Sequence, residues 1–121
     1  MTKEEKNLLL CDLCARLPHG VIVHHDDYWD KDYPRPNEVL TTHNLSQYEK
    51  DLERWNIKPY LRPMSSMSEE EKKELWELLK KPGMTTDVKR LDWLNAHHFD
   101  YRGLIEKGLA LEAPEDMYKT E

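Results

Sequence analysis

The stretch that decides the fold reads Asp92-Trp-Leu-Asn-Ala-His-His-Phe-Asp-Tyr-Arg-Gly-Leu-Ile-Glu-Lys-Gly-Leu-Ala-Leu111, the densest run of apolar and aromatic side chains in the chain. It predicts a helix that ends near His97, a tight corner, and a second short helix that opens at Asp100. The Asp100 carboxylate can accept hydrogen bonds from the free N–H groups of that second helix. Phe99 and Leu104 have the spacing of a hydrophobic staple, which would set the angle between the two helices.

The composition indicates a folded, heavily charged protein. Its 121 residues suit one domain, which at this length buries about two-thirds of the surface that the unfolded chain exposes. Four Trp and six Tyr are too many large rings for a disordered chain, although charged residues make up 35%. The net charge of -6 disfavours nucleic acid as a partner, because binding to phosphates needs clustered Lys and Arg.

The N-terminal region argues for a cytoplasmic protein. Residues 1–17 are charged and then helical in pattern, and Asp12 and Arg16 interrupt the one apolar run, which excludes a signal peptide or a membrane span. The two cysteines agree with a reducing compartment. We therefore expect a cytoplasmic location and no membrane partner.

The first half of the chain predicts two helices and two strands. A capping box precedes a helix over residues 3–17, and the alternating, β-branched residues 20–25 predict a strand. Residues 38–42 are expected to form a second, short strand. Asn44 is then expected to cap a helix that ends at Asn56.

The second half predicts an extended segment followed by helices. The two prolines of residues 57–67 remove backbone donors, so this segment is expected to run extended across the surface of the core. Ser68 and Glu71 form a capping box for a further helix, and residues 85–87 open the helix that leads into the corner. Trp76, on the first of these helices, is expected in the core.

These elements add up to a single small α+β domain over residues 1–114, with four to five helices and a two- or three-stranded sheet. Residues 115–121 form a polar C-terminal tail that is expected to fray. The sequence contains no internal repeat and no linker-like stretch that would divide the domain.

Two stretches carry a resemblance to known sequences. Residues 57–71 and 92–114 resemble those of a group of small uncharacterised proteins encoded in the genomes and prophage-like elements of gut anaerobic bacteria, and residues 8–21 are similar as well. The likeness covers about half of the chain. It implies a bacterial or phage cytoplasmic protein, and it implies no activity, ligand or catalytic residue.

Cys11 and Cys14 form a C-x-x-C pair with three possible meanings. Together with His19 and His24 they have nearly the spacing of a zinc knuckle, since tetrahedral zinc needs four such donors on a short chain. A redox pair is a further alternative. The interpretation that we prefer is structural, because both cysteines fall on the apolar stripe of a predicted helix, where free cysteine behaves as a small buried hydrophobe.

Paired histidines beside aspartates suggest a metal-dependent hydrolase, because imidazole and carboxylate ligands hold the metals that activate water. This alternative assigns His24, His25, Asp26 and His97 as metal ligands, and His98 and Asp100 as catalytic groups. The competing interpretation is that these side chains finish a strand end, a turn and a helix end. We expect the latter, and no cofactor.

A second alternative is a site for a nucleotide or another anionic small molecule. Arginine suits such a site because its planar fork of donors matches a phosphate or carboxylate. The candidate ligand residues are Tyr60, Arg62, Tyr101 and Arg102. No glycine-rich phosphate loop accompanies them.

The preferred hypothesis is a non-enzymatic accessory or regulatory protein that binds another protein, or a second copy of itself. It depends on the acidic, proline-containing loop at residues 26–37, whose large rings beside charges are of the kind that protein interfaces enrich. The predicted contact residues are Tyr28, Trp29, Tyr33 and Arg35.

Overall fold

The computed structural model describes residues 2–25, 37–53, 56–82 and 86–118. Within these ranges the helices are α1 Lys3–Arg16, α2 Thr42–Asp51, α3 Glu69–Lys80 and α4 Thr86–Ala96, and short 3-10 helices span Leu17–His19 and Met64–Ser66. The strands are β1 Ile22–His24, β2 Asn37–Val39, β3 Lys58–Leu61 and β4 Leu111–Glu112. No helix in this part of the chain is long and apolar enough to cross a membrane.

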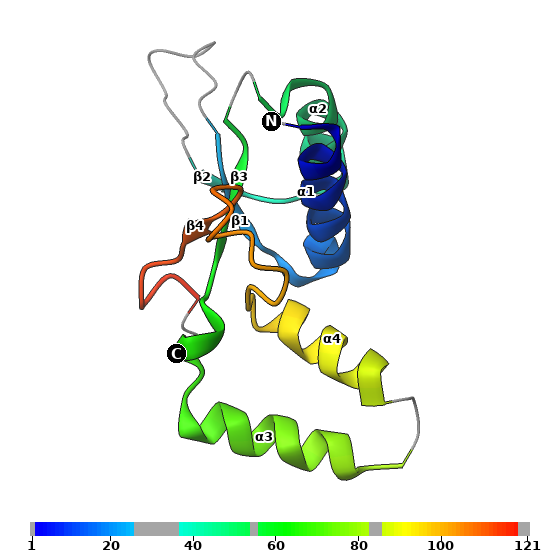
Figure 1. Cartoon of the computed structure of the whole chain (residues 1–121), viewed down its shortest axis with the longest axis vertical. Helices are drawn as coiled ribbons and strands as arrows, with labels where there is room; N and C mark the ends of the chain where they lie inside the picture. Colours follow the sequence, from blue (N-terminus) through cyan, green and yellow to red (C-terminus); the bar gives the residue numbers. More distant parts are fainter. Residues whose placement is uncertain (1, 26–36, 54–55, 83–85, 119–121) are drawn as a thin grey trace.

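The strands form a mixed sheet in the order β2-β1-β3-β4. Strand β1 is antiparallel to β2 and β3, whereas β3 and β4 are parallel. Helices α1 and α2 lie together beside the sheet, and α3 and α4 form a hairpin at one end of the molecule (Figure 1). The predicted α+β class is confirmed, with four strands in the described residues instead of two or three.

The additional strand comes from residues 57–67. The prediction that this segment crosses the surface of the core is wrong, because β3 is an inner strand with β1 on one side and β4 on the other. Pro59 lies opposite Val23 in the ladder, and Pro59 and Leu61 are the buried residues of an alternating pattern. Proline removes a backbone donor but keeps the chain extended, so alternate apolar side chains can still pack into the core.

The predicted capping boxes of α1 and α3 are confirmed, but the start of α2 differs. The prediction that Asn44 caps α2 is wrong. Thr41 is the cap: its hydroxyl accepts from the Asn44 N–H at 3.3 Å, and Asn44 Oδ1 accepts from the Thr41 N–H at 2.7 Å. Because this box begins the helix early, the strand predicted over residues 38–42 ends at Val39.

The segment 92–111 departs from its prediction after the corner. His98 turns the chain with a left-handed φ of 64°. The second short helix is not formed, because residues 104–108 make turns. The Asp100 carboxylate still accepts from two backbone N–H groups, at 2.9 and 3.0 Å, but it caps these turns instead of a helix. Gly108, at the end of these turns, has a φ of 74°, a backbone conformation that glycine adopts without steric cost.

Two clusters of buried side chains form the core. The main cluster consists of Leu9, Leu13, Val21, Val23, Leu40, Tyr48, Leu52, Ile57, Leu61, Leu104, Leu109 and Ala110. The smaller cluster consists of Trp93, Leu94 and Phe99, against which Leu75 and Leu78 of α3 are partly buried. Phe99 and Leu104 thus belong to different clusters, so the predicted staple between them does not describe their packing.

Three side chains that were expected to be buried are exposed. Cys11 and Cys14 are free thiols on the exposed side of α1, because leucines occupy its inward side. Trp76 is 60% exposed, and α3 contains no buried residue. The pattern along a helix identifies an apolar stripe, but it does not determine whether another element covers that stripe.

The last described residues are tied to the sheet by Tyr118. Its hydroxyl donates to the Tyr60 carbonyl at 2.7 Å and accepts from the Ile22 N–H at 2.8 Å. Its ring stacks on His98, with 3.8 Å between the ring centroids, and burial raises the pKa of Tyr118 to about 12. Residues 115–118 are therefore held against the domain rather than frayed, and residues 119–121 of the predicted tail lie outside the described residues.

The substitution Tyr118→Phe tests this anchor. It leaves the ring in place but deprives the partly buried Ile22 N–H of its acceptor, so the free energy of unfolding should fall by about 1–2 kcal/mol in urea denaturation. Tyr60→Phe is the matched control, because Tyr60 contributes its backbone carbonyl to the contact and not its hydroxyl. An unchanged stability of Tyr118→Phe would mean that the tail does not hold the sheet.

Candidate functional site

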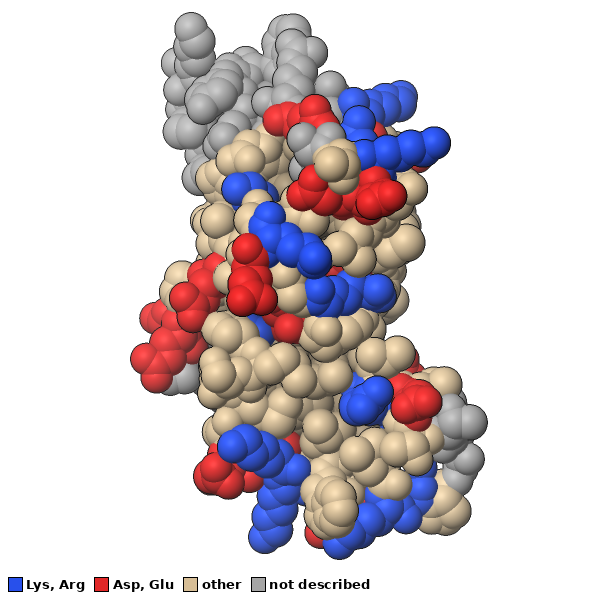
Figure 2. Space-filling view, viewed as in Figure 1, with Lys and Arg blue, Asp and Glu red and all other residues tan. Residues whose placement is uncertain are grey.

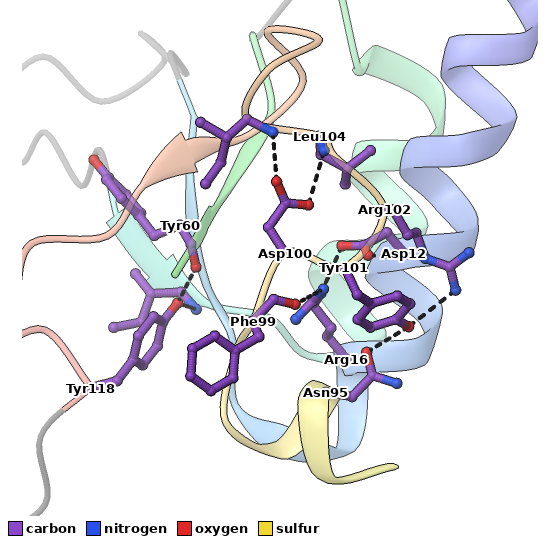
Figure 3. A network of polar contacts seen from close by, with 12 residues as sticks. Asp12, Arg16, Tyr60, Asn95, Phe99, Asp100, Tyr101, Arg102, Leu104 and Tyr118 are labelled. Atoms are coloured by element: carbon purple, nitrogen blue, oxygen red, sulfur yellow. Dashed lines mark hydrogen bonds and ion pairs between the residues drawn. The ribbon is translucent and has the colours of Figure 1, made fainter. Parts of the chain in front are cut away.

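A buried polar network joins α1 to the corner after α4 (Figure 3). Arg16 is 0% exposed, and it donates to the Asp12 carboxylate at 2.7 Å and to the Phe99 carbonyl at 2.6 Å. Arg102 Nε lies 3.2 Å from the other Asp12 oxygen. The Tyr101 ring contacts both guanidinium groups, 5.3 and 5.0 Å from its centroid. Tyr101 and Arg102, which the sequence assigned to an anionic ligand, are thus part of a structural network.

The two predicted catalytic groups also serve the corner. His98 is 8% exposed and stacks on Tyr118, and burial lowers its pKa to about 4, so the imidazole is neutral at neutral pH. Its Nδ1 atom has no hydrogen-bond partner among the residues described. Asp100 uses both carboxylate oxygens to cap the turns that follow.

The predicted metal ligands do not gather in the part of the chain that the structure describes. His24 packs edge-on against a tyrosine ring, and His25 Nε2 lies 3.7 Å from a Glu38 oxygen. His97 lies beside α3, and Asp26 is outside the described residues. No group of three or more described His, Cys, Asp or Glu residues could hold a metal ion. The hydrolase and zinc-knuckle alternatives therefore find no ligand set there.

The predicted contact loop also lies outside the described residues. This concerns Tyr28, Trp29, Tyr33 and Arg35, all between residues 26 and 36. Their role in binding a partner stays a prediction.

A hollow of about 920 Å³ lies between the start of α3 and the segment that follows β4. One wall is formed by residues 62–71 together with His97, and the other wall comes from β4 and the chain up to Tyr118. The acidic and basic side chains in the lining are those of Glu70, Glu71, Glu112, Glu115, Arg62 and His97. Of the four residues predicted for an anionic ligand, Arg62 is the one in this lining.

The Arg62 guanidinium is already engaged inside the hollow. It forms two hydrogen bonds of 2.7 Å to the Glu71 carboxylate, and its central carbon lies 4.1 Å from the Phe99 ring centroid. The hydrogen bonds from Arg62 lower the pKa of Glu71 to about 2, so this carboxylate is ionised and its charge is balanced by the arginine. The arginine therefore has few donors left for an anion.

His97 lies at the edge of the same ion pair. Its ring stacks on Trp93, with 4.1 Å between the centroids, and its two nitrogens lie 3.8 Å from oxygens of Glu71 and Glu74. With Glu71 paired to Arg62, three carboxylates remain in the lining, those of Glu70, Glu112 and Glu115. The electrostatics of the hollow favour a cationic group over the anion that the sequence suggested.

A second candidate surface lies on the outer side of α3. We define the Trp76 surface as Lys72, Lys73, Trp76, Leu79 and Lys80. Its lysines and Trp76 are exposed, and Lys80 Nζ lies 5.1 Å from the indole centroid. Figure 2 shows acidic side chains gathered over β4 and the segment after it, and basic side chains over the end that carries α3.

The sequence contains a pattern that indicates the Trp76 surface. Lysines stand four and three residues before Trp76 and four residues after it, a spacing that places all of them on one side of a helix. The hollow has no comparable pattern in the sequence, because its two walls come from segments about 40 residues apart that the tertiary structure brings together.

The low pKa of His98 predicts a loss of stability in weak acid. The unfolded histidine binds a proton near its usual pKa of 6.5 and the folded one only near 4, so the free energy of unfolding falls as the pH drops through this window. His98→Asn should remove roughly 2 kcal/mol of that fall, because Asn does not titrate and tolerates a positive φ. Urea unfolding at several pH values between 7 and 4 measures the slope of the free energy of unfolding against pH.

His43→Asn, at an exposed position of α2, is the control for this measurement and should keep the slope of the unmodified protein. Equal slopes in all three proteins would show that His98 is not protonated on unfolding in this window.

Comparisons of the chain with protein-family models, with curated proteins and with solved structures find no match. The resemblance of residues 57–71 and 92–114 to small proteins of gut anaerobes stays a prediction. The hollow and the Trp76 surface are the features of the described residues that bear on function.

Proposed function

We propose that the protein is a small accessory or regulatory protein that acts by binding another protein through the Trp76 surface. One observation carries this proposal: Trp76 is 60% exposed in the middle of α3, a helix that has no buried residue. Tryptophan is the residue type most enriched among the side chains that dominate binding energy at protein interfaces.

The packing of α3 supports this role. Leu75 and Leu78 are partly buried against the smaller core cluster, whereas Trp76 lies on the opposite side of the helix. Full burial of a large apolar side chain contributes about 1.5–3 kcal/mol, and most of this contribution is not realised for Trp76 within the chain. A partner that covers the indole ring would gain this free energy on binding.

The charges around the ring indicate what kind of partner fits. Lys72, Lys73 and Lys80 surround Trp76, and Lys72 is also 3.2 Å from Glu69. A polar rim around an apolar centre is the usual arrangement of protein interfaces. We therefore expect a partner surface with an apolar pocket and carboxylates at its edge, since opposite charges increase the rate of association.

The cytoplasmic location remains part of this proposal. Cys11 and Cys14 are exposed free thiols, which persist in a reducing compartment and oxidise outside it. The predicted contact residues of the loop at 26–37 would add a second contact region.

The alternatives have less support. Neither Arg62 nor Arg102 is available as a phosphate clamp, because Arg62 pairs with Glu71 and Arg102 with Asp12. The carboxylates that line the hollow also disfavour a nucleotide.

Trp76→Ala is the direct test. We expect the affinity for the partner to fall about 30-fold or more, as for the dominant residues of other interfaces. The melting temperature should change by no more than a few degrees, because an exposed side chain contributes little to stability. A photo-crosslinking amino acid at position 73 in living cells measures the effect: it should yield a discrete adduct that Trp76→Ala abolishes.

Val39→Ala is the matched control, because Val39 is 52% exposed but lies on β2. It should leave the adduct unchanged. The mass of the adduct distinguishes a second copy of this chain from another protein. An adduct that persists in Trp76→Ala, or a cooperative loss of the fold in that variant, would contradict the proposal.

A further inference from the structure

Strand β4 lies at one edge of the described sheet. In the described sheet, β4 has β3 as its neighbour on one side and no strand on the other. The Ala113 N–H donates to the Leu61 carbonyl at 2.8 Å, and the ladder pairs Leu61 with Glu112. In a parallel ladder, alternate residues of a strand direct both their N–H and their C=O group toward the partner strand. Because Ala113 points toward β3, the N–H and C=O groups of Glu112 point away from it. Such groups are a template for strand addition.

The hollow lies along the same edge. Glu112, Ala113 and Glu115 belong to its lining, opposite the wall formed by the start of α3. Its volume of about 920 Å³ is large enough for several side chains. Small-molecule pockets span roughly 300–1,000 Å³, so this hollow is at the upper end of their range. A chain paired with β4 would therefore direct alternate side chains into a space that exists already.

The charge of the hollow defines the side chains that fit. Because Arg62 and Glu71 neutralise each other, the carboxylates of Glu70, Glu112 and Glu115 dominate the lining. They come from both walls, so a cationic side chain between them would face carboxylates on two sides. A lysine or arginine is the protein side chain with this charge and reach.

We propose that the edge of β4 and the hollow together bind an extended, lysine- or arginine-bearing segment of a partner protein. The backbone of the segment pairs with Glu112, and its basic side chains enter the hollow. Pro114 has no N–H group, so the added ladder ends there and is only a few residues long. This binding mode does not use the Trp76 surface, and it goes beyond the proposed function.

A peptide series tests the proposal on the full chain. The probes are extended octapeptides with Lys or Arg at alternate positions and Thr or Val between them. Two matched series accompany them: one has Glu in place of each basic residue, and the other is N-methylated at alternate amides. Binding is measured by NMR titration, with the Glu112 amide as the reporter. We expect the best basic peptide to bind and to slow hydrogen exchange at Glu112.

The two matched series separate charge from strand pairing. The acidic peptides should not bind, because their carboxylates face those of the hollow. N-methylation should weaken binding at least about tenfold, because it removes the backbone donors that strand addition needs. Spermidine, a small cation without a peptide backbone, should bind more weakly than the best peptide and leave exchange at Glu112 unchanged.

Variants of the chain complete the test. The double variant Glu112→Gln with Glu115→Gln should weaken the best peptide about three- to tenfold, whereas Glu49→Gln, an exposed carboxylate on α2, should not change its affinity. Trp76→Ala should leave peptide binding intact. The proposal is overturned if no basic peptide of the series binds, if binding is insensitive to N-methylation, or if spermidine binds as tightly as the best peptide.

Discussion

A fully buried arginine determines where the corner of the chain lies. Arg16 can be buried as a cation only because the Asp12 carboxylate and the Phe99 carbonyl accept its donors, at 2.7 and 2.6 Å. Leaving such a charge unpaired costs several kcal/mol, so Phe99 is held at this position next to α1. The residues on either side of Phe99 then pair with the end of β3 through the backbone. The Arg62 N–H donates to the His98 carbonyl, and the Asp100 N–H donates to the Arg62 carbonyl, each at 2.8 Å. The rest of the structure follows from this placement.

The backbone position of Arg62 in turn fixes α3. The guanidinium leaves the end of β3 over the Phe99 ring and binds the Glu71 carboxylate in the first turn of that helix. At the other end of the hairpin, Lys89 of α4 donates to the Lys81 carbonyl. Between these ends, Glu74 accepts from the Trp93 indole N–H at 3.2 Å, and a few half-buried leucines pack against the smaller cluster. Helix α3 contributes one side to the hollow and the other to the Trp76 surface. Both surfaces depend on the same attachment.

The sequence predicted features that neighbouring residues determine. The capping boxes of α1 and α3 involve residues three positions apart. The α+β class followed from the same local patterns. Predictions failed where a distant segment decides the outcome. Pro59 became part of an inner strand because β1 and β4 flank it, and Trp76 remained exposed because no element among the described residues packs on its side of α3.

No spacing of residues along the sequence predicts the hollow, since no motif joins Glu70 to Glu112. The polar residues of the corner were identified from the sequence, but their partners were not. Tyr101 and Arg102 looked like a ligand clamp because the pattern does not show that Asp12 and Arg16, about 90 residues earlier, already bind them. Residue types can be read from a sequence, whereas the pairing of buried charges is a property of the tertiary structure.

The parallel pairing of β3 with β4 has a consequence for how the chain is synthesised and folds. Tyr60 pairs with Leu111, so the ladder closes a loop that contains the whole α3–α4 hairpin. The β1–β2 ladder and the hairpin can form from shorter-range contacts, which are faster to make than contacts between distant residues. On a ribosome, the second wall of the hollow therefore emerges after the hairpin, and a nascent chain forms the Trp76 surface before it completes the hollow.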